Sequence, residues 1–420
     1  MTVDLQSLPA GWSRTRVDRV ATVNARIGWK ALTAAEYQPE GYAFLSTPNI
    51  KGREIDFFNV NYISEFRYEE SPELKLRPGD VLLAKDGNTL GIVNIIRDLP
   101  RPATVNGSIA VIRSTGIEPS YLRYVLASRT TQETINMLKG GMGVPHLFQW
   151  DINRLPVPLP PLEEQRRIAD FLDAGTSRID RLVALRRRQS ELVLERSDVV
   201  LTELFSGSNR HREYRFRHLM RSNPCYGVLV PKFSSNGIPL IRVSDLGRLD
   251  QDLDRLPRIE EEQAHEYRRT RISPGDLLIT VVGATIGRCD VAPNGVDGFN
   301  VSRAVARVQL VPELEPELIA SWVRSRGFRQ QAEVATSGSA AQPALNMSDL
   351  AHFTVWLPDG LAKRQNLARC VGAHQQHTDT LLSALNRQLS LLAERRQALI
   401  TAAVTGQIDV STASGRGIEE

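Results

Sequence analysis

The sequence predicts an α+β protein that contains two tandem mixed α/β modules, each followed by a long helix. Three observations support this prediction: short apolar segments between glycine and proline turns, two long segments with a helical repeat of leucine, and a duplication that relates the two halves of the chain. The modules are expected at residues 1–160 and 208–359, and the helices at residues 161–207 and 360–412.

Composition and charge place the chain among folded proteins. The 420 residues are 41% hydrophobic and 24% charged, which suits about two to four domains and argues against disorder. No apolar run approaches the roughly 20 residues that span a bilayer, and the amino terminus lacks the layout of a signal peptide. Cys225, Cys289 and Cys370 lie far apart, which favours a reducing cytoplasm over a disulfide framework. A net charge of +4 is compatible with nucleic-acid binding without establishing it.

The segment 177–206 contains no proline. Alternating spacings of three and four put six of its residues on one stripe of a helix: Leu182, Leu185, Gln189, Leu192, Arg196 and Val199. Roughly 28 helical residues at about 1.5 Å each make a rod of about 40 Å. The segment 379–404 repeats the pattern at a constant offset of 199 positions, as between Gln189 and Gln388. The predicted seam between the helices consists of Leu182, Leu185, Gln189, Leu192, Leu381, Gln388 and Leu391.

The two modules repeat the same order of motifs. RPGDVLLAKDGNTLGIVNI at 77–95 matches SPGDLLITVVGATIGRCDV at 273–291, with an offset of 196 positions. Pro-Gly-Asp predicts a tight turn before a short buried strand, and the later glycines predict turns with positive φ. A phosphate-binding loop is not expected, because no Lys-Ser or Lys-Thr follows these glycines. Further along, Asn106 is paired with Asn300, Ser108 with Ser302, and Pro145 with Pro343.

The junction between the first module and its helix carries a specific motif. LPVPLPPLEEQRRIADFLD at 155–173 is followed directly by RIDRLVALRRRQSEL at 178–192. With this motif, the duplicated layout and the Asp-Val-Leu-Leu and Asn-Gly-Ser motifs of the module, nearly the whole chain resembles the specificity (S) subunit of type I restriction-modification systems. The second junction, LPDGLAKRQNLA at 357–368, departs from the pattern because it lacks the PPLEEQ core.

The resemblance implies both an architecture and a role. Each module would be a target recognition domain that reads one half of a split double-stranded DNA target, and the two helices would pack as an antiparallel coiled coil with pseudo-twofold symmetry. Methyltransferase subunits would dock on this frame, and a restriction and translocase subunit would join them. The chain itself would carry no chemistry and no cofactor, because S-adenosylmethionine, ATP and Mg²⁺ would bind partner subunits. We assign partner binding to Leu162, Glu163, Glu164, Gln165 and Ile168.

Unlike reading heads are expected, because the modules differ most at polar positions. Lys85, Asp86 and Asn88 align with Val281, Val282 and Ala284, and His146, Phe148 and Gln149 align with Ala344, Asn346 and Met347. Differing donors and acceptors imply differing half-sites, and the rod length is close to one DNA turn of about 34–36 Å. The candidate DNA-binding residues are Lys51, Arg53, Lys85, Asn88, His146 and Gln149 in the first module, and Lys232, Arg242, Arg248, Arg268, Arg269, Arg288, Arg303 and Asn346 in the second.

Two other classes of function stay open at this point. One is a DNA methyltransferase, because Asn223-Pro-Cys-Tyr226 resembles the Asn-Pro-Pro-Tyr motif that holds a flipped base, although Cys225 replaces the second proline. The other is a coiled-coil scaffold that reads no DNA. Cys370, His374 and His377 share a helical spacing that suits zinc, but the first copy has no matching ligands. We therefore predict neither a catalytic nor a metal site.

Overall fold

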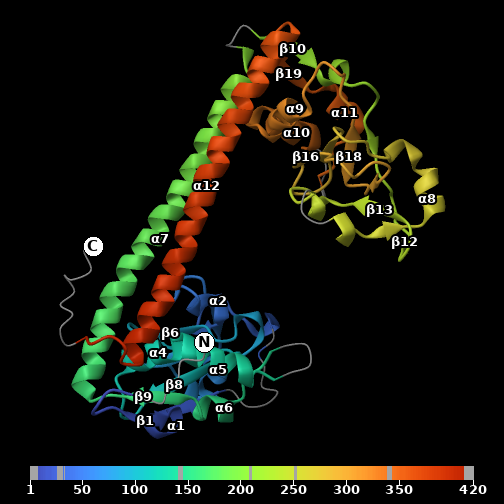
Figure 1. Cartoon of the computed structure of the whole chain (residues 1–420). Coiled ribbons are helices and arrows are strands. Elements are labelled where there is room, and N and C mark those ends of the chain that lie inside the picture. Colours follow the sequence, from blue (N-terminus) through green and yellow to red (C-terminus); the bar gives the residue numbers. More distant parts are fainter. Residues whose placement is uncertain are drawn as a thin grey trace. The chain divides into compact units, whose positions relative to one another are not determined.

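The computed structural model describes residues 8–25, 32, 34–140, 145–207, 211–249, 253–337 and 343–410 (Figure 1). The chain forms two compact units, one made of Met1–Arg186 with Arg387–Glu420 and the other of Arg187–Asn386. Each unit contains one α/β module together with a part of both long helices, α7 (Leu162–Leu204) and α12 (Leu361–Val404). The predicted α+β fold with two modules and two long helices is confirmed.

The first module combines two small sheets with short helices. Its strands are β1 (Ser13–Arg16), β2 (Ala21–Asn24), β3 (Tyr42–Leu45), β4 (Asn61–Ile63), β5 (Val81–Ala84), β6 (Val93–Ile95), β7 (Ala103–Val105), β8 (Ile109–Ser114) and β9 (Pro156–Leu159). Its helices are α1 (Val17–Val20), α2 (Thr47–Ile50), α3 (Glu65–Glu69), α4 (Pro119–Ala127), α5 (Arg129–Leu138) and α6 (Gln149–Asn153), with 3-10 turns η1 (Ala34–Glu36), η2 (Pro72–Leu74) and η3 (Gly87–Thr89). The main sheets have the strand orders β2-β8-β5-β6 and β4-β3-β7.

The second module repeats this arrangement. Its strands are β10 (Arg212–Arg215), β11 (Cys225–Tyr226), β12 (Phe233–Ser234), β13 (Ile238–Ile241), β14 (Arg258–Ile259), β15 (Leu277–Thr280), β16 (Cys289–Val291), β17 (Asn300–Val301), β18 (Val305–Val308) and β19 (Thr354–Leu357). Its helices are α8 (Glu261–Glu266), α9 (Pro316–Arg324), α10 (Arg326–Thr336) and α11 (Met347–His352), with 3-10 turns η5 (Phe216–Leu219), η6 (Val243–Asp245), η7 (Leu253–Arg255) and η8 (Arg268–Thr270). The strand order β11-β18-β15-β16 matches β2-β8-β5-β6 of the first module, and β12-β14-β13-β17 matches β4-β3-β7 with β12 as an additional strand.

The short apolar strand after each Pro-Gly-Asp turn is buried on both faces. In β5, Val81 and Leu83 enter one core and Leu82 and Ala84 enter another, because successive side chains point to opposite faces of a sheet. The first of these cores also takes in Ile168 of α7. The strand therefore holds the module's two layers together and ties one of them to the helix pair.

The glycine turns behave as predicted. Gly87 and Gly283 have φ angles of +70° and +88°, which favour glycine. The amide of Gly87 donates to the carbonyl of Pro145 at 2.9 Å, and that of Gly283 donates to Pro343 at 2.8 Å. The predicted pairing of the two prolines is thus confirmed by equivalent backbone contacts.

The pairing of Asn106 with Asn300 is wrong by two residues. The amide of Asn106 donates to Leu45 at 2.8 Å, and the equivalent amide in the second module, which donates to Ile241 at 2.9 Å, belongs to Ser302. Asn300 is instead fully buried, where its Nδ2 donates to Thr270 at 2.9 Å. A shift of two residues leaves the alternation of faces in a strand unchanged, so the hydrophobic pattern does not detect it. The exposed position next to Ser302, Arg303, therefore matches Gly107.

Within each unit the two long helices run antiparallel and side by side (Figure 1). In the first unit, Nε of Arg396 donates to Asp180 at 3.2 Å. In the second unit, Oγ of Ser197 lies 3.0 Å from Nε2 of His374. The helix α7 has 43 residues within the predicted range 161–207, and the LEEQRRIADFLD segment forms its first three turns ahead of the leucine segment. No described helix combines the length and apolarity needed to cross a bilayer.

The predicted helix seam is wrong by one position. Leu185, Leu192 and Leu391 are 65%, 48% and 54% exposed, and the other members are exposed as well: Leu182, Gln189, Leu381 and Gln388. The less exposed stripe of α7 includes Ile179 and Val183. Both stripes have alternating spacings of three and four, so spacing does not separate them. In α7 the stripe with Leu185 and Leu192 faces solvent, and Ser197 of the inner stripe bonds across the pair. In α12 the inner stripe is itself leucine-rich, with Leu382, Leu385, Leu389 and Leu392.

Candidate nucleic-acid interface

A pocket of about 720 Å³ opens beside the end of β5 in the first module. It lies between the residues that follow β5, the Asn-Gly-Ser segment at 106–108 and the start of α6. Backbone hydrogen bonds bring these segments together: the amide of Lys85 donates to Ser108 at 2.8 Å, and the amide of Leu147 donates to Lys85 at 2.9 Å. The pocket is thus built at the end of the interior strand β5, where backbone hydrogen bonds hold the segments in fixed positions.

Three polar side chains form the centre of this pocket. Nζ of Lys85 lies 3.2 Å from Oδ2 of Asp86, and Nδ1 of His146 bonds to Oδ1 of the same carboxylate. The side chain of Lys85 is only 9% exposed, against 25% for Asp86 and 31% for His146. Asp86 and His146 also form a β-bridge, so backbone pairing fixes the side-chain contact. The Lys85 and His146 predictions stay untested as DNA contacts, but the structure does bring these two residues together.

Aromatic side chains form the rim. The rings of Phe148 and Trp150 stack with their centroids 4.4 Å apart, and the rings of His146 and Phe148 meet edge to face with their centroids 4.5 Å apart. Phe148 is 41% exposed and Trp150 is 58% exposed. Exposed rings beside polar groups suit contact with base faces or thymine methyl groups. Gln149 lies between them and donates from Nε2 to the carbonyl of Val23 at 2.5 Å.

The remaining first-module candidates lie elsewhere. Asn88 belongs to η3, next to the pocket, whereas Lys51 and Arg53 follow α2. Arg53 lines a separate cavity of about 170 Å³ beside α7. Asp86 and Trp150 line the pocket but were not among the predicted DNA-binding residues. The two aromatic residues in the sequence FQW, at positions 148 and 150, could have indicated the aromatic rim. Residues 141–144 of the preceding glycine loop lie outside the described residues.

An exposed aromatic side chain near Lys51 and Arg53 was also missed. Phe58 is 93% exposed. Asp56 holds its loop, because Oδ1 accepts the amide of Phe58 at 2.8 Å and that of Asn59 at 3.1 Å. The hydrogen bonds from the Asn59 side chain and backbone lower the pKa of Asp56. Phe58 is therefore presented to solvent by a braced turn.

The second module has the same backbone but apolar side chains at the matching place. Val282 bridges to Ala344 as Asp86 bridges to His146. The amide of Val281 donates to Ala304 at 2.9 Å, which repeats the Lys85 contact of the first module. The predicted alignment of these positions is thus confirmed. The polar centre of the first module has no counterpart in the second.

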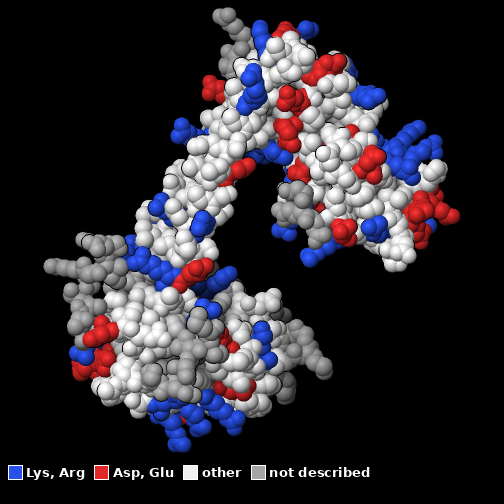
Figure 2. Space-filling model, viewed as in Figure 1, with Lys and Arg blue, Asp and Glu red and all other residues white. Residues whose placement is uncertain are grey.

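Some second-module candidates gather around the segment 226–233. The amide of Arg303 donates to Val228 at 2.9 Å, and Lys232 directly precedes β12 in this segment. The carbonyl of Arg269 accepts a hydrogen bond from Sγ of Cys225 at 3.2 Å. Arg268 neighbours it in η8, and Figure 2 shows Lys and Arg side chains gathered near α8 beside an acidic group. Exposed apolar side chains share the segment, namely Leu229, Val230 and Phe233.

The other second-module candidates are engaged in local contacts. Arg242 pairs with Asp245 at 3.1 Å, and Arg248 lines a cavity of about 390 Å³ beside this turn. Arg288 bonds to the carbonyl of Leu246. Asn346 caps α11, because its Oδ1 accepts the amide of Asp349 at 2.8 Å. Arg242, Arg288 and Asn346 are thus held by contacts within the module, and Asn346 directly follows Leu345, whose carbonyl accepts a hydrogen bond from Tyr226.

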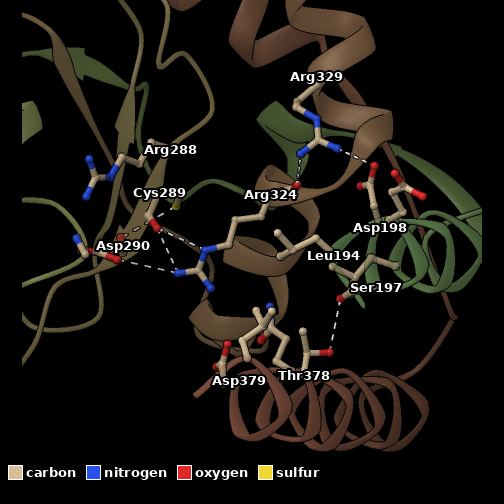
Figure 3. A pocket seen from close by; sticks show the side chains of 15 residues that line it. Leu194, Ser197, Asp198, Arg288, Cys289, Asp290, Arg324, Arg329, Thr378 and Asp379 are labelled. Carbon is tan, nitrogen blue, oxygen red and sulfur yellow. Dashed lines mark hydrogen bonds and ion pairs between the residues drawn. The ribbon is translucent and has the colours of Figure 1, made fainter. Parts of the chain in front are cut away.

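A cavity of about 920 Å³ lies between the second module and its part of the helix pair (Figure 3). Arg329 of α10 pairs with Asp198 of α7 at 2.6 Å and donates to the carbonyl of Arg324 at 2.9 Å. Arg324 in turn donates to the carbonyl of Cys289 at 2.9 Å. Burial raises the pKa of the Cys289 thiol to about 12. These contacts attach the module to the helices, and the cavity is distinct from the group at 226–233.

The first module is attached to its helices at an equivalent place. Nε2 of Gln397 donates to the carbonyl of Ala127 at 2.9 Å. Gln397 and Asp198 lie 199 positions apart, which is the offset of the helix repeat. Polar anchoring at one helix position is thus a shared feature of both modules, made by different side chains.

The predicted partner-binding residues are partly wrong. Gln165 is 2% exposed, and its Oε1 accepts the amide of Glu118 at 2.9 Å. Ile168 is 1% exposed and belongs to the module's core. The helix begins at Leu162, so positions 165 and 168 lie one turn apart and face the module. Leu162 and Glu163 are exposed, whereas Glu164 accepts a hydrogen bond from Trp12 at 3.1 Å.

Residues that suggested the methyltransferase and zinc alternatives make structural contacts in the fold. Tyr226 lies in β11 and donates its hydroxyl hydrogen to the carbonyl of Leu345 at 3.2 Å. His374 bonds to Ser197 across the helix pair. Among the described residues, no cluster of three or more histidine, cysteine or acidic side chains is placed to hold a metal ion.

Solved structures share the fold. A chain from a study of the complex assembly and conformational transition of the type I R-M system aligns with a TM-score of 0.70 at 20% identity, covering 96% of this chain and 100% of that chain. The HsdS subunit from Thermoanaerobacter tengcongensis aligns with a TM-score of 0.50 at 20% identity, covering 97% and 100%. The class defined by fold and site is thus a duplicated α/β protein with paired helices and two unlike candidate reading surfaces.

Sequence comparison shows which known proteins this chain resembles. Residues 9–190 match the model of the Type I restriction modification DNA specificity domain. The Type I restriction enzyme EcoBI specificity subunit of Escherichia coli is 24% identical over 434 residues, which cover 96% of this chain and 88% of that protein. The EcoKI specificity subunit of Escherichia coli strain K12 is 21% identical, with 96% and 90% covered. Over nearly its whole length, the chain is therefore similar to specificity subunits of type I restriction enzymes.

Proposed function

We propose that this chain is the DNA-sequence-recognition subunit of a type I restriction-modification complex and reads an asymmetric bipartite target. The observation that carries the proposal is the contrast between equivalent sites. Asp86 and His146 occupy the bridge positions of the first module, where the second has Val282 and Ala344. Two modules with one backbone and different donor and acceptor sets suit the reading of two different half-sites.

Binding follows from two kinds of contact in this proposal. Exposed cations such as Arg268 and Arg303 contact phosphates, which supplies affinity that falls steeply with salt. The pocket centre and the aromatic rim contact base edges, which supplies discrimination. The net charge of +4 is small for a DNA clamp, so partner subunits supply much of the positive surface.

The chain is proposed to act without chemistry of its own. Methyl transfer, with S-adenosylmethionine, belongs to methyltransferase subunits, and ATP and Mg²⁺ belong to a restriction and translocase subunit, all in the cytoplasm. Leu185 and Leu192 of α7 are exposed leucines that suit burial against such a partner. Leu162 and Glu163 at the start of α7 stay in the proposed contact, because both are exposed.

Methylation mapping tests this proposal. Genomic DNA from cells with and without this chain is sequenced for modified bases, with the partner subunits present in both strains. We expect a two-part motif with a fixed spacer that appears only when the chain is present. Absence of any chain-dependent motif would contradict DNA recognition and favour a scaffold that reads no DNA.

A second assay separates recognition from catalysis. The purified chain is incubated with S-adenosylmethionine and mixed-sequence DNA, alone and with its methyltransferase partner. We expect methyl transfer only with the partner. Transfer by the chain alone would support the methyltransferase alternative, for which Tyr226 is the residue to substitute first.

A further inference from the structure

We propose that Asp86 selects a base with an exocyclic amino group, cytosine or adenine, at one position of the half-site read by the first module. The inference rests on the proposed function and names one specificity-determining residue within it. It starts from the place of this carboxylate, which lines the 720 Å³ pocket together with Asn106, Ser108 and the aromatic rim.

A carboxylate on a DNA-facing surface is unfavourable unless it is compensated, because phosphates repel it. Asp86 is compensated on both oxygens, by Lys85 at Oδ2 and by His146 at Oδ1. Lys85 is nearly buried, so its ammonium group interacts with the Asp86 carboxylate more than with solvent. A neutral side chain at this position would need no such compensation. The arrangement therefore maintains a negatively charged hydrogen-bond acceptor in the pocket.

The carboxylate retains capacity to accept further hydrogen bonds. Two oxygens offer about four lone-pair positions, and the described partners of the side chain occupy two of them. In the major groove, exocyclic amino groups of cytosine and adenine are the donors, whereas guanine and thymine present acceptors there. An acceptor held rigidly by a strand bridge therefore favours the first two bases and disfavours the other two.

The second module provides an internal comparison. Val282 occupies the position of Asp86 on the same kind of bridge and has no acceptor in its side chain. Arg303, at the position of Gly107, adds a donor instead. The second module therefore does not select a base with an exocyclic amino group at the corresponding position. Substitution of Asp86 is expected to affect only the half of the motif that the first module reads.

The test compares methylation motifs of cells that carry the full chain as wild type, Asp86→Asn or Asp86→Val, with all partner subunits present. Asp86→Asn keeps the shape of the side chain, and Asp86→Val copies the second module. Asp98→Asn is the matched control, because Asp98 is an exposed aspartate of the same module outside the pocket. The half-site of the first module is identified by exchanging that module for a relative's.

In the wild-type motif we expect cytosine or adenine at one first-half position, on one strand. Both Asp86 variants are expected to relax that position, with discrimination against guanine and thymine reduced about 5- to 100-fold. Asp98→Asn is expected to leave the motif unchanged. Duplexes with cytosine or adenine at that position, and analogues that lack the amino group, then show which of the two bases is read.

An unchanged motif in both Asp86 variants would overturn the inference, as would relaxation confined to the second half-site. Methylation that falls uniformly at all sequences would also overturn it, because Asp86 would then only position Lys85 and His146. Melting of the purified variants, measured beside the wild type, shows whether a variant that methylates nothing is folded; a folded but wholly inactive pair of variants counts against base selection. A wild-type strain without any two-part motif would instead refute the proposed function itself.

Discussion

Asp80 accepts two hydrogen bonds from Arg113, from Nε to Oδ1 and from Nη2 to Oδ2, each at 2.7 Å. The carboxylate is 1% exposed and also accepts the amide of Arg77 at 2.8 Å, which closes the Pro-Gly-Asp turn. The aspartate of the Pro-Gly-Asp motif is thus structural. It fixes the strand β5 that leads into the pocket.

We expect Asp80→Ala to lower the free energy of unfolding by about 3 kcal/mol or more, because it leaves a partly buried guanidinium without its partner. Asp198→Ala is the comparison, since the Asp198–Arg329 pair is 30% and 47% exposed and exposed pairs contribute about 0.5 kcal/mol. Thermal and urea unfolding of both variants measures the difference. Equal losses would show that burial does not set the value of these pairs.

The corrected helix seam gives a second prediction. Ile179 is 6% exposed and Leu185 is 65% exposed. We expect Ile179→Ala to cost about 2–4 kcal/mol in the free energy of unfolding, and Leu185→Ala to change it by less than about 0.5 kcal/mol. Unfolding curves of the two variants decide the matter, and the reverse order would restore the leucine stripe as the seam.

Two glycine turns that look alike in the sequence are expected to differ in tolerance. Gly87 and Gly91 both have positive φ, at +70° and +91°. A Cβ on Gly87 meets open space, whereas one on Gly91 lies 2.4 Å from Oε1 of Gln132. Gly87→Ala should cost about 1 kcal/mol from backbone strain alone, and Gly91→Ala should cost more. Melting temperatures of the two variants test this order.

The cysteines provide a prediction on pH and reactivity. Burial raises the pKa of Cys289 to about 12 from an ordinary value of 9.0, so the folded state favours the thiol. This contribution is fully present below about pH 9 and is lost as the pH rises toward 12. We expect Cys370, which is exposed, to react with iodoacetamide at pH 8 while Cys289 does not.

Mass spectrometry of the labelled native protein identifies the modified cysteine, and labelling after denaturation is the control for reagent access. Cys289→Ala should reduce the loss of stability between about pH 9 and pH 11 relative to wild type. Rapid native labelling of Cys289 would contradict its buried position.

The architecture could be predicted from the sequence because the duplication presents each element twice, in two different sequences. The sequence was not sufficient to choose between two registers that have the same periodicity. The seam moved from Leu182 to Val183 because both stripes have coiled-coil spacing, and Asn300 was matched to Asn106 because a two-residue shift keeps strand faces unchanged. The same degeneracy is visible at Asp276, which Arg307 reaches at 2.6 Å from a strand position two residues away from that of Arg113.

The candidate site was predictable in part for a different reason. Lys85 and His146 were found by comparing the modules, since charged residues replaced by valine and alanine stand out. Asp86 was named among the differing polar positions but not among the DNA contacts, and the two partners of its carboxylate are visible only in the structure. Gln165 and Ile168 were misassigned because the start of α7 determines which face they occupy, and a motif alone does not show the face.

The central claim is that two unlike modules read two separate halves of one target. Exchanging residues 1–154 for those of a relative with a different motif, followed by methylation mapping of the cells, tests it most directly. We predict that one half of the motif changes to the relative's sequence while the other half stays as in wild type. A motif that is unaltered in both halves, or altered in both, would contradict the account.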